Sequence, residues 1–238
     1  MVRALFRQNL TGQAMPMTDF ILRNSSPADL TEYVARQLAT FFPDGHSASA
    51  KVLDSHMRIA LERLRSCFAG IQKPKFRDGP HILFNYMHPD HYAVLLYLLA
   101  NTIVQHDRDD PLAFRVYYLN KALHGLDVYP AVKLPEVFQF MHPLGTVLGH
   151  AEYGNYFSVY QGCSVGSGED GACPVIGECV VLYAGACVIG RSRIGNNVVL
   201  GANSKVIDTD IPDHRVLVSE KNYQIRVNSK HVMDRRFR

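Results

Sequence analysis

A six-residue period in the second half of the chain constrains its fold more than any other feature. Aliphatic or aromatic residues recur along this half, mostly six positions apart, at Tyr153, Val159, Val165, Ile176, Leu182, Val188, Ile194, Leu200 and Val206. A period of six matches neither the 3.6-residue turn of an α-helix nor the two-residue alternation of a β-strand. It is typical of a hexapeptide solenoid, in which three faces make one triangular coil of about 18 residues. The sequence therefore predicts stacked coils whose aliphatic positions point inward.

This period also predicts which residues stack. Ile176 is expected on Ile194, Leu182 on Leu200 and Val188 on Val206, because each pair is one coil apart. The step from Val165 to Ile176 is 11 residues instead of six, so residues 166–175 are predicted to form an extruded loop. Such a loop is either a tolerated insertion or the wall of a site, and we favour the second interpretation.

The first half of the chain has helical signals. Ser26 and Pro27 are typical of a helix start, and Pro43 ends the apolar pattern that follows. A second helix is expected from Ser47 or Ser49 to Gly70, then a linker over 72–80, and two more helices over about 91–105 and 111–125. We predict an α+β protein with a helical bundle at 1–125, a parallel β-helix of hexapeptide repeats at 126–215 and a basic C-terminal tail at 216–238.

Composition and charge exclude several classes of protein. The formal net charge is +3, and six of the basic residues lie in 221–238 against Asp234 alone, which we interpret as a solvated tail without a nucleic-acid partner. The five cysteines include no CxxC pair, and the solenoid pattern assigns them to different corners, so we expect free thiols, a cytoplasmic location and no metal site. The longest apolar run, 93–100, is far shorter than the roughly 20 residues of a membrane span.

One imidazole and one carboxylate stand out as candidate catalytic groups. His142 lies where the solenoid begins, and Asp127 precedes it by 15 residues, a little less than one coil. A carboxylate bonded to one ring nitrogen fixes the tautomer and raises the basicity of the other nitrogen, so this pair could deprotonate a hydroxyl or an amine. Spacing alone is weak support, because a histidine near an aspartate is more often structural.

Several short segments carry a resemblance to a known family. In order along the chain they are 127–133 (DVYPAVK), His142, Leu148-Gly149, 158–161 (SVYQ), Pro174-x-Ile176-x-Glu178, 184–186 (AGA) and Leu200-Gly201-Ala202-x-Ser204. With them, the chain resembles a serine acetyltransferase of the left-handed β-helix acyltransferase class. The resemblance implies direct acetyl transfer from acetyl-CoA, with His142 as general base and Asp127 as its partner. It also implies a homotrimer, in which two trimers can pair, with the donor bound between neighbouring solenoids.

The same resemblance implies the residues that contact the donor. These are Gly166, Ser167, Ala184, Gly185 and Ala202, where small residues admit the pantetheine arm, although solenoid corners need small residues in any case. Lys221 and Arg226 are candidates for the CoA phosphates on charge alone.

The acceptor side departs from the family pattern. The position of the family's serine-binding aspartate is Met141, and its Arg-His pair is replaced by Ala172 and Cys173. Because a buried serine carboxylate would lose a charge-assisted hydrogen bond, we expect another small-molecule acceptor, a sugar or small metabolite, bound near Met141, Cys173, Asp90 and His91. The alternatives are a true serine acetyltransferase of cysteine biosynthesis with other pocket residues, and a non-catalytic trimeric scaffold.

Overall fold

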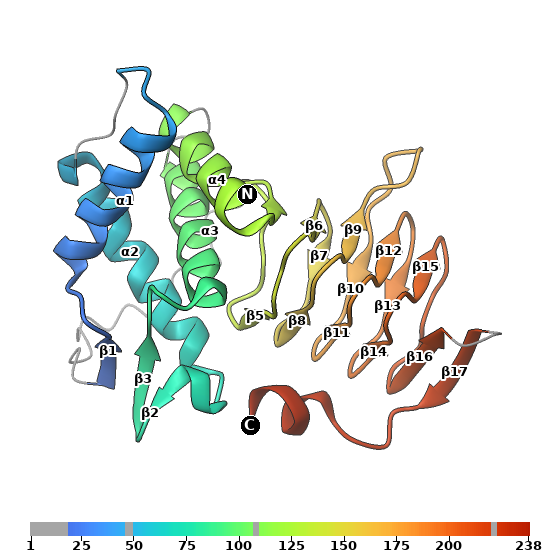
Figure 1. Ribbon diagram of the computed structural model, residues 1–238. Coiled ribbons are helices and arrows are strands. Elements are labelled where there is room, and N and C mark those ends of the chain that lie inside the picture. The colour runs from blue at the N-terminus through green and yellow to red at the C-terminus, as the bar shows by residue number, and fades with distance from the viewer. Residues whose placement is uncertain (1–18, 46–49, 107–109, 220–222) are drawn as a thin grey trace, which may run out of the picture.

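The computed structural model describes residues 19–45, 50–106, 110–219 and 223–238, which form a layer of helices beside a β-solenoid (Figure 1). The predicted order, helical bundle first and parallel β-helix second, is confirmed. Within those ranges no helix combines the length and the hydropathy that crossing a membrane requires.

In the described part of the first half, four α-helices make up the layer. They are α1 (Pro27–Phe41), α2 (Ala50–Ala69), α3 (Pro89–His106) and α4 (Pro111–His124). The helix α1 starts as predicted: the Ser26 hydroxyl accepts from the backbone N–H of Asp29, whose carboxylate accepts from the N–H of Ser26. The helix α3 lies at the centre of the layer, because its residues from Asp90 to Ile103 are all buried.

The expected linker at 72–80 is wrong. This stretch contains a short helical turn, η2 (Pro74–Phe76), and a strand, β2 (Arg77–Asp78), which pairs with β3 (His81–Phe84). Strand β1 (Phe20–Leu22) then adds to β3 in parallel. Sequence periodicity missed this small sheet because its strands are two to four residues long and its parallel pair joins segments some 60 residues apart.

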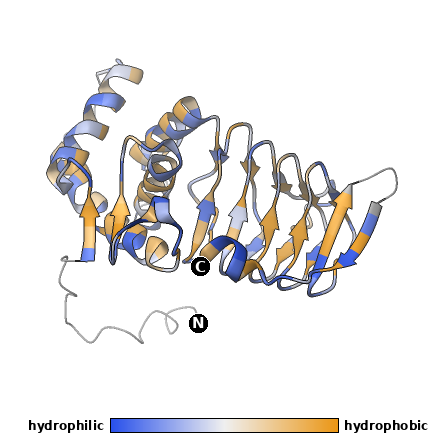
Figure 2. Ribbon diagram, turned by 60° about the horizontal axis from the view of Figure 1, so that its bottom comes forward, coloured by the Kyte–Doolittle hydropathy of each residue, from blue (hydrophilic) through white to orange (hydrophobic). Residues whose placement is uncertain are grey.

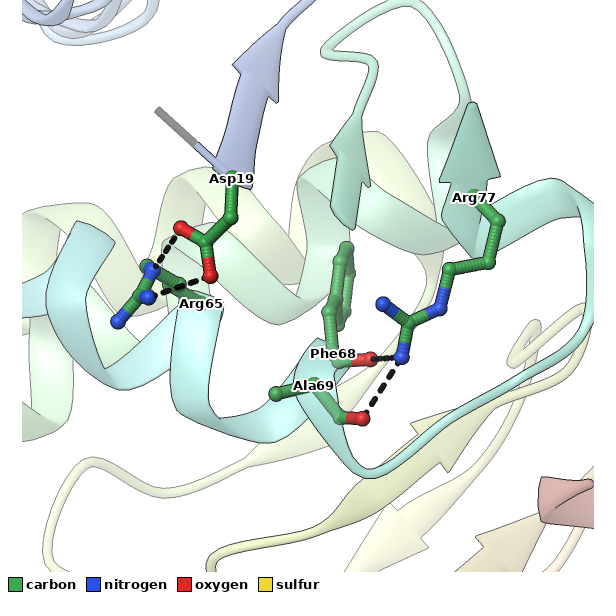
Figure 3. Close-up of polar contacts among 5 residues, drawn as sticks. All are labelled: Asp19, Arg65, Phe68, Ala69 and Arg77. Atoms are coloured by element: carbon green, nitrogen blue, oxygen red, sulfur yellow. Dashed lines mark hydrogen bonds and ion pairs between the residues drawn. The ribbon is translucent and has the colours of Figure 1, made fainter. Parts of the chain in front are cut away.

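Two arginines fix this sheet to the end of α2. Figure 3 shows the Arg65 guanidinium donating to both carboxylate oxygens of Asp19, at 2.9 and 2.6 Å. It also shows Arg77 donating to the carbonyl oxygens of Ala69 (2.7 Å) and Phe68 (3.4 Å), which lack partners further along the helix. The Arg77 contacts hold the η2 turn, which carries Lys75 towards the solenoid.

Short strands build the solenoid. They are β4 (Asp127–Val128), β5 (Phe138–Phe140), β6 (Val147–Leu148), β7 (Glu152–Tyr153), β8 (Phe157–Val159), β9 (Ser164–Gly166), β10 (Val175–Ile176), β11 (Val181–Leu182), β12 (Cys187–Ile189), β13 (Arg193–Ile194), β14 (Val199–Leu200), β15 (Lys205–Ile207) and, as a final hairpin, β16 (Arg215–Ser219) and β17 (Tyr223–Val227). They form three sheets, one for each face of the coil, in the orders β13-β10-β7, β17-β16-β14-β11-β8-β5 and β15-β12-β9-β6-β4. Figure 2 shows apolar residues concentrated along these strands.

The predicted stacking is confirmed residue by residue. Ile176 pairs with Ile194, Leu182 with Leu200 and Val188 with Val206. Across the extruded loop the pairing partner shifts to 23 positions away, since Val165 pairs with Val188. The insertion is therefore absorbed outside the ladder, and the coils on both sides of it remain in register.

The predicted solvated tail is wrong for its last residues. After β17 the chain returns along the solenoid and ends in a short π-helical turn, η3 (Met233–Phe237), near the helical layer (Figure 1). Val232 and Phe237 are fully buried, and the Phe237 carbonyl accepts from the backbone N–H of Gln72. The prediction weighed the six positive charges and overlooked two apolar side chains, whose burial gives this segment a reason to dock.

Candidate active site

His142 presents its imidazole at the edge where the solenoid meets the helical layer. The residue lies in the turn between β5 and β6, and its side chain is exposed. Its backbone is in the left-handed region, with φ +51°, which is uncommon for residues other than glycine, although asparagine, aspartate and histidine adopt it more often than most. Its backbone N–H donates to Oδ1 of Asp90 at 3.2 Å. Among the described residues, no group forms a hydrogen bond with the ring, so the ring is available to a ligand.

Asp127 lies on the neighbouring coil at the same edge. Its backbone N–H donates to the Thr146 carbonyl at 2.9 Å, and β4 pairs with β6 in the register Asp127 to Val147. The carboxylate accepts from the Tyr117 hydroxyl at 2.5 Å and from the Lys121 ammonium at 2.6 Å, both on α4. The structure therefore brings Asp127 and His142 to one edge of consecutive coils, while the carboxylate bonds to α4 and not to the imidazole.

The partners of Asp127 keep it ionised. Partial burial opposes its charge, but the hydrogen bonds from Lys121 and Tyr117 outweigh burial, and the pKa of the carboxyl lies below its ordinary value. Burial and the neighbouring carboxylate raise the pKa of Tyr117 to about 12. The Asp127 carboxylate therefore stays ionised one strand away from the segment that carries His142, with Lys121 as its counter-charge.

A second charged cluster lies on the other side of His142. The Lys75 ammonium is 3.2 Å from Oδ2 of Asp90 and 3.2 Å from Sδ of Met141. The Asp90 side chain is 6% exposed and that of Lys75 is 25% exposed. Two of the four predicted acceptor-side residues, Asp90 and Met141, are thus gathered around one lysine next to the candidate base.

His91, the third predicted acceptor-side residue, is fully buried. Its ring stacks between those of His88 (4.4 Å between centroids) and Phe76 (4.8 Å). Its Nδ1 accepts from the backbone N–H of Asn85 at 3.3 Å, so the neutral ring carries its proton on Nε2, which is buried without a partner among the described residues. Burial, with the nearby His88 and Lys75, lowers the pKa of His91 to about 3. The residue supports the wall of the site from behind and does not reach the surface.

Cys173, the fourth, lies apart from the others. It is exposed at the end of the extruded loop and lines a cavity of about 360 Å³ with Lys133, His150 and Glu152. The loop folds on itself through the Gly168 N–H and the Ala172 carbonyl (2.9 Å). His142 is not among the residues that line this cavity.

The predicted donor-contacting residues fall into two groups. Ala184, Gly185 and Ala202 lie at one corner of the coil, where Gly185 has φ +72° and the Asn203 N–H donates to the Ala184 carbonyl at 2.8 Å. Gly166 and Ser167 lie at the far end of the neighbouring sheet, since Gly166 pairs with Ile189, the last residue of β12. Arg226 is exposed on β17, and Lys221 is outside the described residues.

Comparison with known proteins decides the family. No protein-family model matches the chain. The chain is 30% identical over 161 residues to the serine acetyltransferase of Helicobacter pylori strain 26695, and the match covers 63% of this chain and 88% of that protein. The chain belongs to the serine acetyltransferase family.

Two further comparisons agree with this assignment. The chain is 30% identical over 172 residues to the serine acetyltransferase of Synechococcus elongatus, covering 71% of this chain but only 65% of that longer protein. The crystal structure of serine acetyltransferase from Brucella abortus in complex with coenzyme A has the same fold, with a TM-score of 0.65, 19% identity and coverage of 88% and 85% of the two chains. The resemblance inferred from the sequence is confirmed, and with it the assignment to the acyltransferase class of enzymes.

Three polar residues that contact the candidate site in this serine acetyltransferase homologue were not identified from the sequence. Tyr117 and Lys121 are four positions apart and so share one face of α4, a signal that could have been linked to the first strand after that helix. Lys75 had no such signal, because it lies in a segment that periodicity assigns to a linker and reaches Met141 across 66 positions.

Proposed function

We propose that the protein is an acetyl-CoA-dependent serine O-acetyltransferase in which His142 is the general base. The observation that carries the proposal is the 30% identity to serine acetyltransferases, which extends over 88% of the Helicobacter pylori protein. The exposed imidazole of His142, at the position that the family pattern gives to the base, supports it.

The proposed chemistry is a direct transfer. The imidazole removes the proton from the acceptor hydroxyl while its oxygen attacks the thioester carbonyl of acetyl-CoA. The carbon–sulfur bond then breaks, CoA leaves and receives the proton from the imidazolium, and the acetyl group stays on the acceptor as an ester. A positioned general base of this kind typically contributes a factor of 10² to 10⁴ to the rate.

Asp127 is proposed to stabilise the imidazolium that forms during transfer. Its carboxylate is ionised and lies on the coil next to that of His142, and its present partners, Tyr117 and Lys121, fix its position. The carboxylate bonds to Tyr117 and Lys121 and not to the imidazole, so its proposed effect on the imidazolium is electrostatic.

The donor is proposed to lie between the solenoids of a homotrimer. The two groups of predicted donor contacts lie at opposite ends of one sheet, Ala184, Gly185 and Ala202 at one end and Gly166 with Ser167 at the other. One solenoid therefore offers two half-grooves, and packing of identical copies would bring the Gly166 end of one copy to the Ala184 corner of the next. Pairing of two such trimers and a cytoplasmic location, which five free cysteine side chains support, complete the proposal.

The proposed acceptor is serine and not the sugar that was expected from the sequence. The curated relatives compared with this chain are serine acetyltransferases, and their names do not support the sugar expected from the sequence. The missing loop arginine at Ala172 was the argument against serine, and Lys75 weakens that argument because it supplies a cation beside Met141, although Asp90 shares its charge.

The test measures CoA release from acetyl-CoA with a thiol reagent. We expect turnover with L-serine in the unaltered protein and a fall of about 10³-fold in kcat after His142→Ala, because the base is removed. Affinity for CoA, measured by calorimetry, should stay within a few-fold, because the donor contacts are elsewhere.

Amino sugars, nucleotide sugars and oligosaccharides serve as competing acceptors in the same assay. Turnover with one of these but not with serine would reject the serine acceptor and keep the base. Serine turnover that survives His142→Ala would reject the proposed base.

A further inference from the structure

The strongest unassigned feature near the site is the contact between Asp90 and the backbone of His142. A histidine with φ +51° pays a steric cost that the surrounding structure must offset. The one hydrogen bond formed by the His142 N–H is to Oδ1 of Asp90, at 3.2 Å. The bond is at the long end of hydrogen-bond distances, but the acceptor side chain is only 6% exposed, so water competes little for it.

The Asp90 carboxylate does not cap its own helix, although its sequence position suggests that it would. It is the second residue of α3, where an acidic side chain ordinarily interacts with the N–H groups and the dipole of its own helix. Both of its oxygens instead accept from outside that helix, Oδ1 from His142 and Oδ2 from the Lys75 ammonium at 3.2 Å. The geometry directs the carboxylate away from its helix and towards the solenoid turn.

The support for this carboxylate comes from three sides. Lys75 stands over the Phe76 ring at 5.1 Å and thereby keeps a fixed place on the η2 turn. His88 stacks on His91 with 4.4 Å between ring centroids, and the Asp90 carboxylate acts electrostatically on the pKa of His88. Arg77, two residues after Lys75, fixes this segment by donating to the Ala69 carbonyl at the end of α2 (Figure 3).

We propose that Asp90 is a positioning residue for acetyl transfer, whose carboxylate, held by Lys75, fixes the backbone of His142 and thereby the direction of its imidazole. This inference rests on the proposed function, because it matters only if His142 is the base. The helical layer then has a part in catalysis, since it sets the angle at which the solenoid presents its reactive ring.

The competing explanation is that the carboxylate serves only to join the two layers. In that case its charge and its ion pair with Lys75 would matter, while the place of Oδ1 would not. Two conservative variants separate these explanations. Asp90→Asn keeps an acceptor oxygen at the same position but loses the charge, whereas Asp90→Glu keeps the charge and can keep Lys75 but moves the oxygen by one methylene.

The experiment measures kcat and KM for acetyl-CoA and L-serine in both variants, together with hydrogen exchange of a peptide that contains His142. We expect Asp90→Glu to lower kcat by roughly 30-fold, because a displacement of about 1 Å in a reacting group can cost up to 100-fold. Asp90→Asn should stay within about fivefold of the unaltered protein, and the KM for acetyl-CoA should change by less than twofold in both. Faster exchange of the His142 amide is expected in Asp90→Glu alone.

Asp19→Ala is the matched control. It removes a two-bond ion pair to Arg65 that ties the same sheet to α2 without contact to the site, so it should lower stability and leave kcat unchanged. The inference is overturned if Asp90→Glu turns over as fast as the unaltered protein, or if Asp90→Asn is the more damaged of the two. Activity that persists in His142→Ala would instead reject the proposed function, a result that is independent of the Asp90 variants.

Discussion

The solenoid and its junction with the helical layer are held together in different ways. In the solenoid each strand pairs with the strand one coil away, and the same register recurs from β10 and β13 to β12 and β15. At the junction every contact is unique: the Cys67 thiol donates to the Phe138 carbonyl at 3.2 Å, and Asp90 accepts from His142. The repeated strand pairing gives the solenoid a regular edge, and individual side-chain contacts from the helical layer position residues such as His142 on that edge.

The two regions also differ in what they bury. Inside the solenoid the buried polar side chains include small hydroxyls, such as Thr146, Ser158 and Ser204. At the junction, by contrast, an aspartate and a histidine, Asp90 and His91, are buried. Burial of an ionisable group lowers stability unless the group has a partner. The cost of burying Asp90 and His91 therefore lies next to His142, where the proposed reaction takes place.

The variant with the largest expected loss of stability, Gly154→Ala, tests how closely consecutive coils of the solenoid pack. A Cβ atom at Gly154 would lie 2.4 Å from the backbone carbonyl of Gly177 in the next coil, a contact that no side chain can relieve. We therefore expect Gly154→Ala to lower the free energy of unfolding by about 3 kcal/mol, as overpacking against backbone forces two coils apart. Urea unfolding at fixed protein concentration measures the change.

Gly79→Asn is the matched control for this variant. Gly79 lies in the turn between β2 and β3 with φ +58°, and a Cβ atom there would meet nothing within 4 Å. Asparagine tolerates this backbone conformation, so the control should unfold at nearly the same urea concentration as the unaltered protein. Equal stability of Gly154→Ala and Gly79→Asn would show that the coils are not packed as tightly as the structure has them.

The same difference explains how much could be predicted from the sequence. Inside the solenoid, contact partners are a fixed number of positions apart, so the pairing of Leu182 with Leu200 follows from the period alone. Even the pair of Asp127 and His142 could be brought to one edge by counting residues, and the structure does place their segments on neighbouring coils.

The junction could not be predicted in this way. Lys75 reaches Met141 across 66 positions, and the Arg236 carbonyl accepts from the Gln139 amide across 97. No period relates such positions, and the local signals at Lys75 and Arg236 favour a solvated linker and a solvated tail. The directions of side chains could not be predicted from the sequence either, since Asp90 turns away from its helix and Asp127 bonds to α4.

Acid should weaken the junction through His91. Its pKa in the folded protein is about 3, below the value of about 6.5 for an exposed histidine, so the folded state keeps the ring neutral. The stability that depends on this neutral ring is complete above pH 6.5 and is lost as the pH falls towards 3. By pH 5 we expect this residue to have lowered the free energy of unfolding by about 2 kcal/mol.

His91→Phe provides the comparison for this pH effect. The new ring can stack on Phe76 and His88 and does not titrate, so the fall in stability between pH 7 and pH 5 should be smaller by about the same 2 kcal/mol. The remaining fall belongs to other groups, such as His124, whose pKa burial also lowers. Parallel pH profiles for the two proteins would mean that His91 is not neutral and buried in solution.

The smallest predicted effect concerns the C-terminal segment, which joins the repeating and the non-repeating regions. The Arg236 guanidinium lies 5.3 Å from the Tyr160 ring centroid and 4.9 Å from that of Tyr183, two rings that stack on consecutive coils, and it donates to the Tyr183 hydroxyl. We expect Arg236→Ala to lower the free energy of unfolding by about 1 kcal/mol, as for a partly desolvated cation–π contact. Arg238→Ala, which removes an exposed ion pair with Asp234, should change nothing measurable. If both variants unfold at the same urea concentration, the Arg236 guanidinium has no measurable part in docking the segment, which then depends on the burial of Val232 and Phe237 and on its backbone hydrogen bonds.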